Sequence, residues 1–227
     1  DFSYDSSSGI KNKGKYIAFA ETGTTNNSGQ KTGIDYLKDL GITHVHLLPT
    51  NDFSSGDESG YWDDYCWGYD PKNYNIPDGM YSTNPYDGNV RVNEYKQMVK
   101  SLHDNGISVV TDVVFNHVAS TGDFSMNVIV PDYFIRPNSN GTGCGNDVAT
   151  ERSMVRKFIV DSIVYWAEEY HIDGFRFDLV GILDTQTINE IAEEVHKIDP
   201  SIILYGEGWD MYTNVTKPNI SLAKQGN

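Results

Sequence analysis

The stretch Gly-Phe-Arg-Phe-Asp-Leu-Val (174–180) is a short apolar run that ends on a carboxylate, Asp178. A second run of the same kind, Leu-Tyr-Gly-Glu-Gly-Trp-Asp (204–210), ends on Glu207. In a parallel α/β barrel the reactive groups lie at the C-terminal ends of the strands, where the loops begin. Two successive strand ends that carry carboxylates therefore indicate one shared pocket.

The run Ile-Ser-Val-Val-Thr-Asp-Val-Val-Phe-Asn-His-Val (107–118) repeats this arrangement, with β-branched residues before Asn116 and His117. Apolar periodicity predicts strands at 16–19, 43–48, 108–115, 174–177 and 202–205, and helices at 33–40, 93–105, 153–170 and 185–199. Asn93 is the expected N-cap of the second helix. Alternating strands and helices build a parallel sheet with right-handed crossovers. The pattern predicts a (β/α)8 TIM barrel of which about the first five β/α units are present.

The domain organisation expected from this pattern has one unit. Residues 1–15 form a lead-in, 16–210 a partial barrel, and 211–227 the truncated start of the next loop. The stretch from Pro49 to about Val92 and the Gly-rich stretch 141–147 are expected to be loops, the first facing substrate and the second a turn-rich connector.

Composition excludes several partner classes. A formal net charge of −15 disfavours nucleic acid and anionic membrane surfaces. No apolar run approaches membrane-spanning length, and the first residues have no signal-peptide pattern. Fifteen Tyr and four Trp suit the faces of sugar rings, so a neutral polysaccharide is the expected partner. Because such a polymer is too large to enter a cell, we expect a secreted or cell-surface location.

Four motifs together resemble the alpha-amylase superfamily of glycoside hydrolases: the three strand ends above and Tyr-Cys-Trp-Gly-Tyr-Asp-Pro (65–71). The resemblance runs roughly from Tyr16 to Asp210. The motif sequences Gly-Glu-Gly-Trp and Trp-Gly-Tyr-Asp-Pro are most similar to those of the type I pullulanases, which are starch-debranching members of the family.

The resemblance implies that Asp178 is the nucleophile and Glu207 the general acid/base. A retaining mechanism predicts a separation of about 5–5.5 Å between their carboxyl groups. For Glu207 to be protonated near neutral pH, burial and the neighbouring negative charge must raise its pKa. Arg176 lies two positions before Asp178, so both side chains point to the same face of the strand. Its guanidinium is expected to keep the aspartate ionised.

The resemblance also implies a set of substrate-binding residues. Tyr69 is the expected aromatic platform under the sugar ring, and His117 the expected donor to a sugar hydroxyl. Leu179 and Trp209 match the debranching pattern. The complete expected substrate-binding set is Tyr69, His117, Arg176, Leu179 and Trp209. Three further residues are expected to support these side chains, namely Asp112, Asn116 and Asp70.

No metal site is predicted. His44 and His46 alternate on one strand, but no third ligand lies at useful spacing, so we expect a structural pair rather than a zinc site. Some relatives hold calcium through an Asn at the position of Asn116; without EF-hand spacing, calcium is only an option here. Cys66 and Cys144 can pair only if their Cα atoms lie within about 7 Å, which the sequence leaves open.

The leading prediction for function is hydrolysis of α-1,6-glucosidic bonds in pullulan, amylopectin and branched dextrins, with retention at the anomeric carbon. The alternatives are an α-1,4-acting amylase or amylopullulanase, and a non-catalytic glucan-binding relic of the same barrel. An open sheet leaves a strand edge and apolar faces uncovered. We therefore expect the 227 residues alone to be inactive and poorly soluble.

Overall fold

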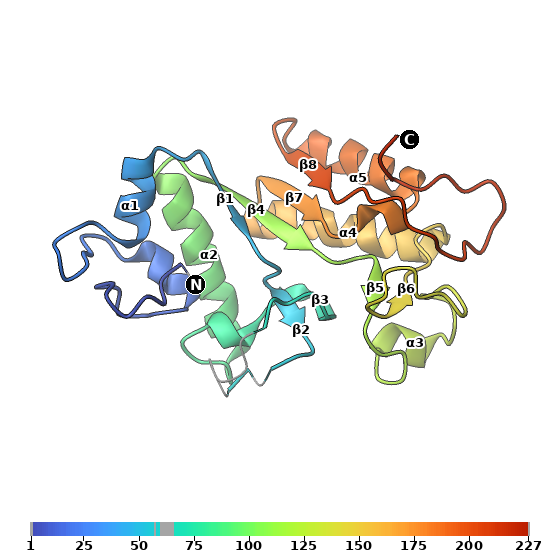
Figure 1. Ribbon diagram of the computed structural model, residues 1–227, viewed down its shortest axis with the longest axis horizontal. Helices are drawn as coiled ribbons and strands as arrows, with labels where there is room; N and C mark the ends of the chain where they lie inside the picture. The colour runs from blue at the N-terminus through green and yellow to red at the C-terminus, as the bar shows by residue number, and fades with distance from the viewer. Residues whose placement is uncertain (1, 57, 60–65, 227) are drawn as a thin grey trace.

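The chain is built around a four-stranded parallel sheet. The computed structural model describes residues 2–56, 58–59 and 66–226. The sheet has the strand order β1-β4-β7-β8, and its strands are β1 (His44–Leu47), β4 (Ser108–Val113), β7 (Gly174–Phe177) and β8 (Ile203–Gly206) (Figure 1). The larger helices are α1 (Gly33–Leu40), α2 (Gly88–Asp104), α4 (Ser153–Tyr170) and α5 (Thr185–Ile198). Because consecutive strands are neighbours and parallel, the sheet is part of a (β/α)8 barrel, as predicted.

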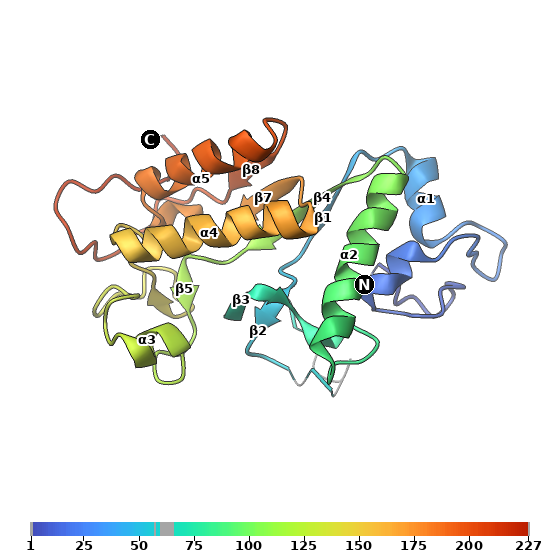
Figure 2. The same cartoon turned by 180° about the vertical axis from the view of Figure 1, so that it is seen from behind.

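The helices cover the outer face of this sheet. Figure 2 shows α4 and α5 in front of β7 and β8, on the side opposite to the view of Figure 1. Apolar side chains of α2, α4 and the strands form the core between them, including Tyr95, Leu102, Ile159, Ile163 and Phe175. In the part of the chain that the structure describes, no helix is both long and apolar enough to span a membrane.

Smaller elements lie before the first strand and in the loops that follow the strands. They are η1 (Tyr16–Ala20), β2 (Asn51–Phe53), β3 (Pro71–Pro77), η2 (Gly79–Tyr81), β5 (His117–Val118), α3 (Ser125–Ile129), β6 (Asn146–Asp147) and η3 (Val180–Ile182). β2 pairs with β3 and β5 pairs with β6, both antiparallel. The stretches 50–92 and 141–147 are therefore not only loops, because they contain strands of these two ribbons. Such pairing between distant short segments has no local sequence pattern.

The strand predicted at 16–19 is wrong, because these residues form the 3₁₀ helix η1. The N–H of Ala18 donates to the carbonyl of Lys15 at 3.0 Å. The ring of Tyr16 is buried, and its hydroxyl donates to the carbonyl of Asp78 at 3.0 Å. A short apolar run fits a buried helical turn as well as a strand. The described sheet consequently has four parallel strands rather than five.

The start of the second predicted helix is also wrong. Helix α2 begins at Gly88, and its N-cap is Asp87, whose carboxylate accepts from the N–H of Asn89 at 2.9 Å. Asn93 lies inside the helix. The first turn has few apolar residues, so apolar periodicity did not reveal it, whereas an N-cap aspartate is a strong start signal.

The strand register brings the predicted site together. Arg176 of β7 is aligned with Asp112 of β4 and with Tyr205 of β8. The N–H of Asp178 donates to Val113 on one side, and the N–H of Glu207 donates to the carbonyl of the β7 residue Phe177. The three acidic residues therefore stand at the C-terminal ends of adjacent strands.

Candidate active site

One guanidinium group holds all three strand-end carboxylates. Nη1 of Arg176 donates to Oδ1 and Oδ2 of Asp112 at 3.0 and 2.9 Å, and to Oδ1 of Asp178 at 3.0 Å. Nη2 of Arg176 donates to Oε2 of Glu207 at 2.7 Å. The structure thus brings together the two residues predicted to be catalytic, through the residue predicted to control their charge.

Asp178 is nearly buried, with 9% of its surface exposed. Asn116 donates through Nδ2 to Oδ2 of Asp178 and to its backbone carbonyl, both at 2.8 Å. Burial raises the pKa of Asp178, the Asn116 bond and the Arg176 charge lower it, and the neighbouring carboxylates raise it again. The net pKa is raised, so Arg176 offsets only part of the cost of burying this charge.

The expected rise in the pKa of Glu207 is wrong for this structure, in which the pKa is lowered. Burial raises this pKa, but 30% of the side chain is exposed, and two donors outweigh that contribution. Nε1 of Trp209 donates to Oε1 of Glu207 at 2.6 Å, and Arg176 donates to its other oxygen. Hydrogen bonds and a positive charge both favour the carboxylate form.

The residue after Asp178 turns the chain sharply. Leu179 has φ of 39° and ψ of 47°, in the left-handed region that a leucine rarely adopts. In this conformation the backbone N–H of Leu179 helps to lower the pKa of Glu207. Backbone strain of this kind concentrates at functional sites.

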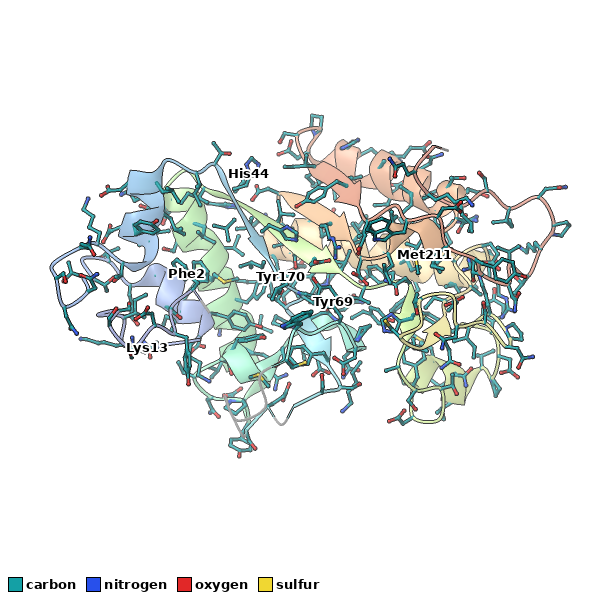
Figure 3. The ribbon with its side chains drawn as sticks, viewed as in Figure 1. Phe2, Lys13, His44, Tyr69, Tyr170 and Met211 are labelled. Carbon is teal, nitrogen blue, oxygen red and sulfur yellow. The ribbon has the colours of Figure 1, made fainter. Side chains whose placement is uncertain are left out.

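Tyr69 lies against the strand-end cluster. Its hydroxyl donates to Oδ2 of Asp112 at 2.8 Å, and Asp112 is only 2% exposed. Burial and the hydrogen bond to this carboxylate raise the pKa of Tyr69, so the phenol stays protonated. Figure 3 shows Tyr69 near the middle of the molecule, just before β3 in the chain. Asp112 therefore orients both Arg176 and Tyr69.

The neighbouring pair Asn116 and His117 is buried. Nδ1 of His117 donates to Oδ1 of Asn116 at 2.5 Å, and burial lowers the pKa of His117. The imidazole is therefore neutral with its proton on Nδ1. The Asn116 side chain therefore links His117 to Asp178, accepting from the first through its oxygen and donating to the second through its amide nitrogen.

A hollow of about 540 Å³ adjoins the cluster, and its lining includes Cys66, Trp67, Tyr69, Asp70, His117 and Cys144. Both cysteines are free thiols. Oδ1 of Asp70 accepts from the hydroxyl of Ser55 at 2.8 Å, and its backbone carbonyl accepts from Ser54, so Asp70 shapes the loop. Tyr65, the first residue of this motif, lies outside the described residues.

The strand histidines have separate partners. Nδ1 of His44 bonds the hydroxyl of Thr43 at 2.8 Å, whereas Nδ1 of His46 bonds the hydroxyl of Tyr205 at 3.1 Å. Nε2 of His46 lies 3.6 Å from Asp112. The two imidazoles therefore take part in different local contacts.

A separate acidic group lies beside β2 and η2, where Asp52, Glu58 and Asp78 bring their carboxylates together. Arg91 donates to both oxygens of Glu58 at 2.6 and 2.7 Å. Burial raises the pKa of Asp78 to about 7. Within this group Arg91 therefore neutralises Glu58.

Sequence reasoning missed the residues that support the site from behind. Asp147 is fully buried, and its backbone pairs with that of His117 across β5 and β6. Its Oδ2 accepts from the hydroxyls of Thr213 and Ser139, both at 2.6 Å. Locally, the sequence shows only an aspartate that follows a Gly-rich turn. The Thr213 hydroxyl that bonds this aspartate comes from a distant segment of the chain.

Paired carboxylates and a shared arginine on the strand ends of a partial barrel define a glycoside-hydrolase type of site. Residues 18–140 match the family of the alpha-amylase catalytic domain. The chain belongs to the alpha-amylase family. Among the similar proteins, a pullulanase of Bacillus subtilis is 50% identical over 94% of this chain, and the chloroplastic pullulanase 1 of Arabidopsis thaliana is 34% identical over 88%.

Solved structures agree with this assignment. The pullulanase of Paenibacillus barengoltzii in complex with maltohexaose and alpha-cyclodextrin matches 99% of this chain with a TM-score of 0.94 and 46% identity. The type I pullulanase of Bacillus subtilis in complex with maltose matches 96% with a TM-score of 0.91 and 49% identity. The chain spans only 30% of the length of the Bacillus subtilis sequence and 36% of the Paenibacillus structure.

Proposed function

We propose that this chain supplies the nucleophile and the acid/base of a retaining glycoside hydrolase whose barrel is completed by further strands. The observation that carries the proposal is the Arg176 fork, which bonds Asp178 at 3.0 Å and Glu207 at 2.7 Å. Carboxylates that share one guanidinium lie close together. This arrangement agrees with the short separation, about 5–5.5 Å, that a retaining mechanism uses.

In the proposed reaction Asp178 attacks the anomeric carbon while Glu207 protonates the departing oxygen. The resulting glycosyl ester on Asp178 is hydrolysed by a water molecule that gives its proton to Glu207. Tyr69 stacks under the sugar ring at this centre, and Nε2 of the neutral His117 is left to contact a sugar hydroxyl.

The acid step has an electrostatic requirement. Glu207 needs a raised pKa to be protonated, yet Trp209 and Arg176 lower that pKa in the free protein. A bound glucan that excludes water from the site raises the pKa of Glu207. Substrate binding therefore prepares the acid.

For the substrate, we propose α-1,6-glucosidic bonds in pullulan, amylopectin and branched dextrins. The support is the high identity to proteins named pullulanase and the Leu179 and Trp209 positions after the two carboxylates. A polymer of this size is cut outside the cell, so we propose a secreted or cell-surface enzyme, which fractionation of the source culture tests.

The test uses a polypeptide that contains the complete barrel. We expect release of reducing ends from pullulan, loss of the α-1,6 signals in the NMR spectrum, and a first product with the α anomeric configuration. If amylose is cleaved while pullulan remains intact, the enzyme acts on α-1,4 bonds instead. Glucan binding without any hydrolysis would show a binding relic instead.

The isolated 227 residues are expected to be inactive and poorly soluble. In the described sheet β1 and β8 are the two edge strands, and both include exposed residues. Unpaired parallel edges promote association. Size-exclusion chromatography and a pullulan assay on this piece test the expectation, and a soluble, active monomer would contradict it.

A further inference from the structure

The segment that follows Glu207, which we name the strap (209–217), is tightly packed against two glycines. A side chain at Gly181 would place its Cβ 2.1 Å from the carbonyl of Trp209. A side chain at Gly141 would place its Cβ 2.0 Å from the carbonyl of Tyr212. Figure 1 shows the chain after β8 passing close to the loops that contain β5 and β6, and Figure 3 labels Met211 on this path.

The far end of the strap enters a buried polar cluster, which we name the Arg136 hub: Arg136, Ser139, Asp147, Glu151 and Thr213. Arg136 is fully buried and forms an ion pair with Glu151 at 2.8 Å. It also donates to the carbonyl of Ile182 at 2.8 Å. The proposed reaction uses none of these residues.

Thr213 is the residue through which the strap joins the centre of the hub. Its hydroxyl donates to Oδ2 of Asp147 at 2.6 Å and accepts from Nη1 of Arg136 at 3.0 Å. The hydroxyl of Ser139 lies 3.1 Å away. With 7% exposure, Thr213 makes these contacts out of water. A threonine hydroxyl can serve a donor and an acceptor at once, which valine cannot.

Both ends of this connection reach the candidate active site. On one side, the backbone of Asp147 pairs with His117, which lines the hollow beside Tyr69. On the other side, the strap begins at Trp209, which donates to Glu207. The Thr213–Asp147 bond therefore ties the wall that carries His117 to the wall that carries the acid/base.

We propose that Thr213 is a positioning residue that locks the strap so that Trp209 stays bonded to Glu207 opposite His117. The proposal rests on the proposed hydrolase function. Thr213 does not touch the reacting atoms; it acts through Asp147 at one end and through the strap at the other. Loss of its hydroxyl frees the strap and loosens the bond between Trp209 and Glu207.

The test compares Thr213→Val with Thr213→Ser in a polypeptide with the complete barrel. Two buried hydrogen bonds are lost in the valine variant, and we expect kcat on pullulan to fall about tenfold. The serine variant keeps the hydroxyl and should restore most of kcat. Maltotriose affinity is expected to change less than twofold.

The pH profile separates positioning from mere stability. The charged or donating groups that face Glu207 are Arg176, Asp178, the Leu179 N–H and Trp209. Of these, only Trp209 lies on the strap, and its bond lowers the pKa of Glu207. In Thr213→Val we therefore expect the basic limb of kcat to move to higher pH, which Thr213→Ser should reverse.

Thr50→Val is the matched control, because the hydroxyl of this buried threonine bonds Tyr95 at 3.1 Å, away from the strap. It should lose thermal stability without a shift of the pH profile. If Thr213→Val does not fold, Ser139→Ala is the second variant. It removes the 3.1 Å contact with Thr213, the 2.6 Å bond to Asp147 and the bond to the N–H of Asn214, but it keeps the Thr213–Asp147 bond, so it should give a smaller shift in the same direction.

The outcomes are distinguishable. A wild-type polypeptide that does not hydrolyse glucan overturns the proposed function and the positioning role with it. An active wild type whose Thr213→Val variant, or Ser139→Ala variant if the first does not fold, keeps its kcat and its pH profile overturns the positioning role alone.

Discussion

Arg176 and Arg136 both bind carboxylates, but their surroundings differ in charge and in access to water. Arg176 faces three carboxylates at the strand ends, with 18% of its side chain exposed. Arg136 faces one carboxylate, Glu151, and both side chains are fully buried. The first cluster keeps excess negative charge beside an open hollow, whereas the Arg136–Glu151 pair is neutral and closed.

The pKa directions follow from this difference. Burial raises the pKa of Glu151, but bonds from Arg136 and Thr216 outweigh it and lower the pKa to about 2. Burial also raises the pKa of Asp178, and Arg176 does not reverse this because it is shared with Asp112 and Glu207. An arginine that is shared by three carboxylates does not hold all of their pKa values low, as proton and glycosyl transfer require. An arginine that binds a single carboxylate forms a fixed structural ion pair.

The largest effect is expected for Asp178→Asn in a polypeptide with the complete barrel. Removing the nucleophile should lower kcat on pullulan on the order of 10³-fold or more, because no covalent intermediate forms. Maltotriose binding, measured by calorimetry, should persist, since asparagine keeps the size of the side chain and its oxygen can still accept from Arg176 or Asn116. Full activity in this variant would remove Asp178 from the mechanism.

The Arg136 hub is expected to respond in stability rather than in chemistry. Arg136→Met leaves Glu151 buried and unpaired, so the free energy of unfolding should fall by about 3–5 kcal/mol. The double variant Arg136→Met/Glu151→Leu removes both charges and should recover part of this loss. Urea unfolding of the wild type, of each single variant and of the double variant measures the coupling energy between Arg136 and Glu151. If the losses of the single variants simply add in the double variant, the two residues are not a dedicated pair.

Acid provides a milder test of the same ion pair. The folded-state pKa of Glu151 is about 2, below the unfolded value of about 4.3, so the folded state binds fewer protons between these values. Its contribution is complete above pH 4.3 and is lost as the pH falls toward 2, by on the order of 3 kcal/mol. Glu151→Gln should flatten this part of the stability curve. An unchanged acid slope would show that other carboxylates govern it.

The Arg176 fork is tested by Arg176→Lys, which keeps the charge but loses the planar donors that reach three carboxylates. Loss of a charged hydrogen bond of about 1.5–3 kcal/mol predicts a fall in kcat of about 10- to 100-fold. Thermal stability should change little in comparison with Arg136→Met. A lysine variant with normal kcat would mean that charge alone is sufficient there.

The strand ends could be predicted from sequence because their information is local. In 174–180 and 204–210 an apolar run, a carboxylate and a turn follow one another, and Gly174–Phe177 forms β7 as expected. The helix Ser153–Tyr170 was equally predictable from its apolar periodicity. By contrast, residues 16–19 gave a false strand because four apolar residues do not distinguish a buried 3₁₀ turn from an extended segment.

The supporting contacts could not be predicted, because they join segments that are distant in the chain. The Arg136 hub connects Ser139 and Asp147 to Thr213, and neither segment has a motif that names its partner. The pKa of Glu207 was likewise out of reach, because its direction depends on where Trp209 and Arg176 place their donors. Local patterns indicate which residues are candidates for the chemistry, and the folded structure shows how these residues are held.

The smallest effect is expected at the edge of the Arg176 cluster, for Tyr69→Phe. This change removes the 2.8 Å hydrogen bond from the phenol to Asp112 but keeps the ring that is proposed to stack under the sugar. Arg176 still holds both oxygens of Asp112 after this change, so only part of the about 1.5–3 kcal/mol of a hydrogen bond to a charged group is lost, and kcat should fall about two- to tenfold. Tyr69→Ala also removes the ring and should raise KM, which Tyr69→Phe should not. If both variants behave alike, the hydroxyl rather than the ring carries the role, and Asp112 positions substrate through Tyr69 instead of merely orienting Arg176.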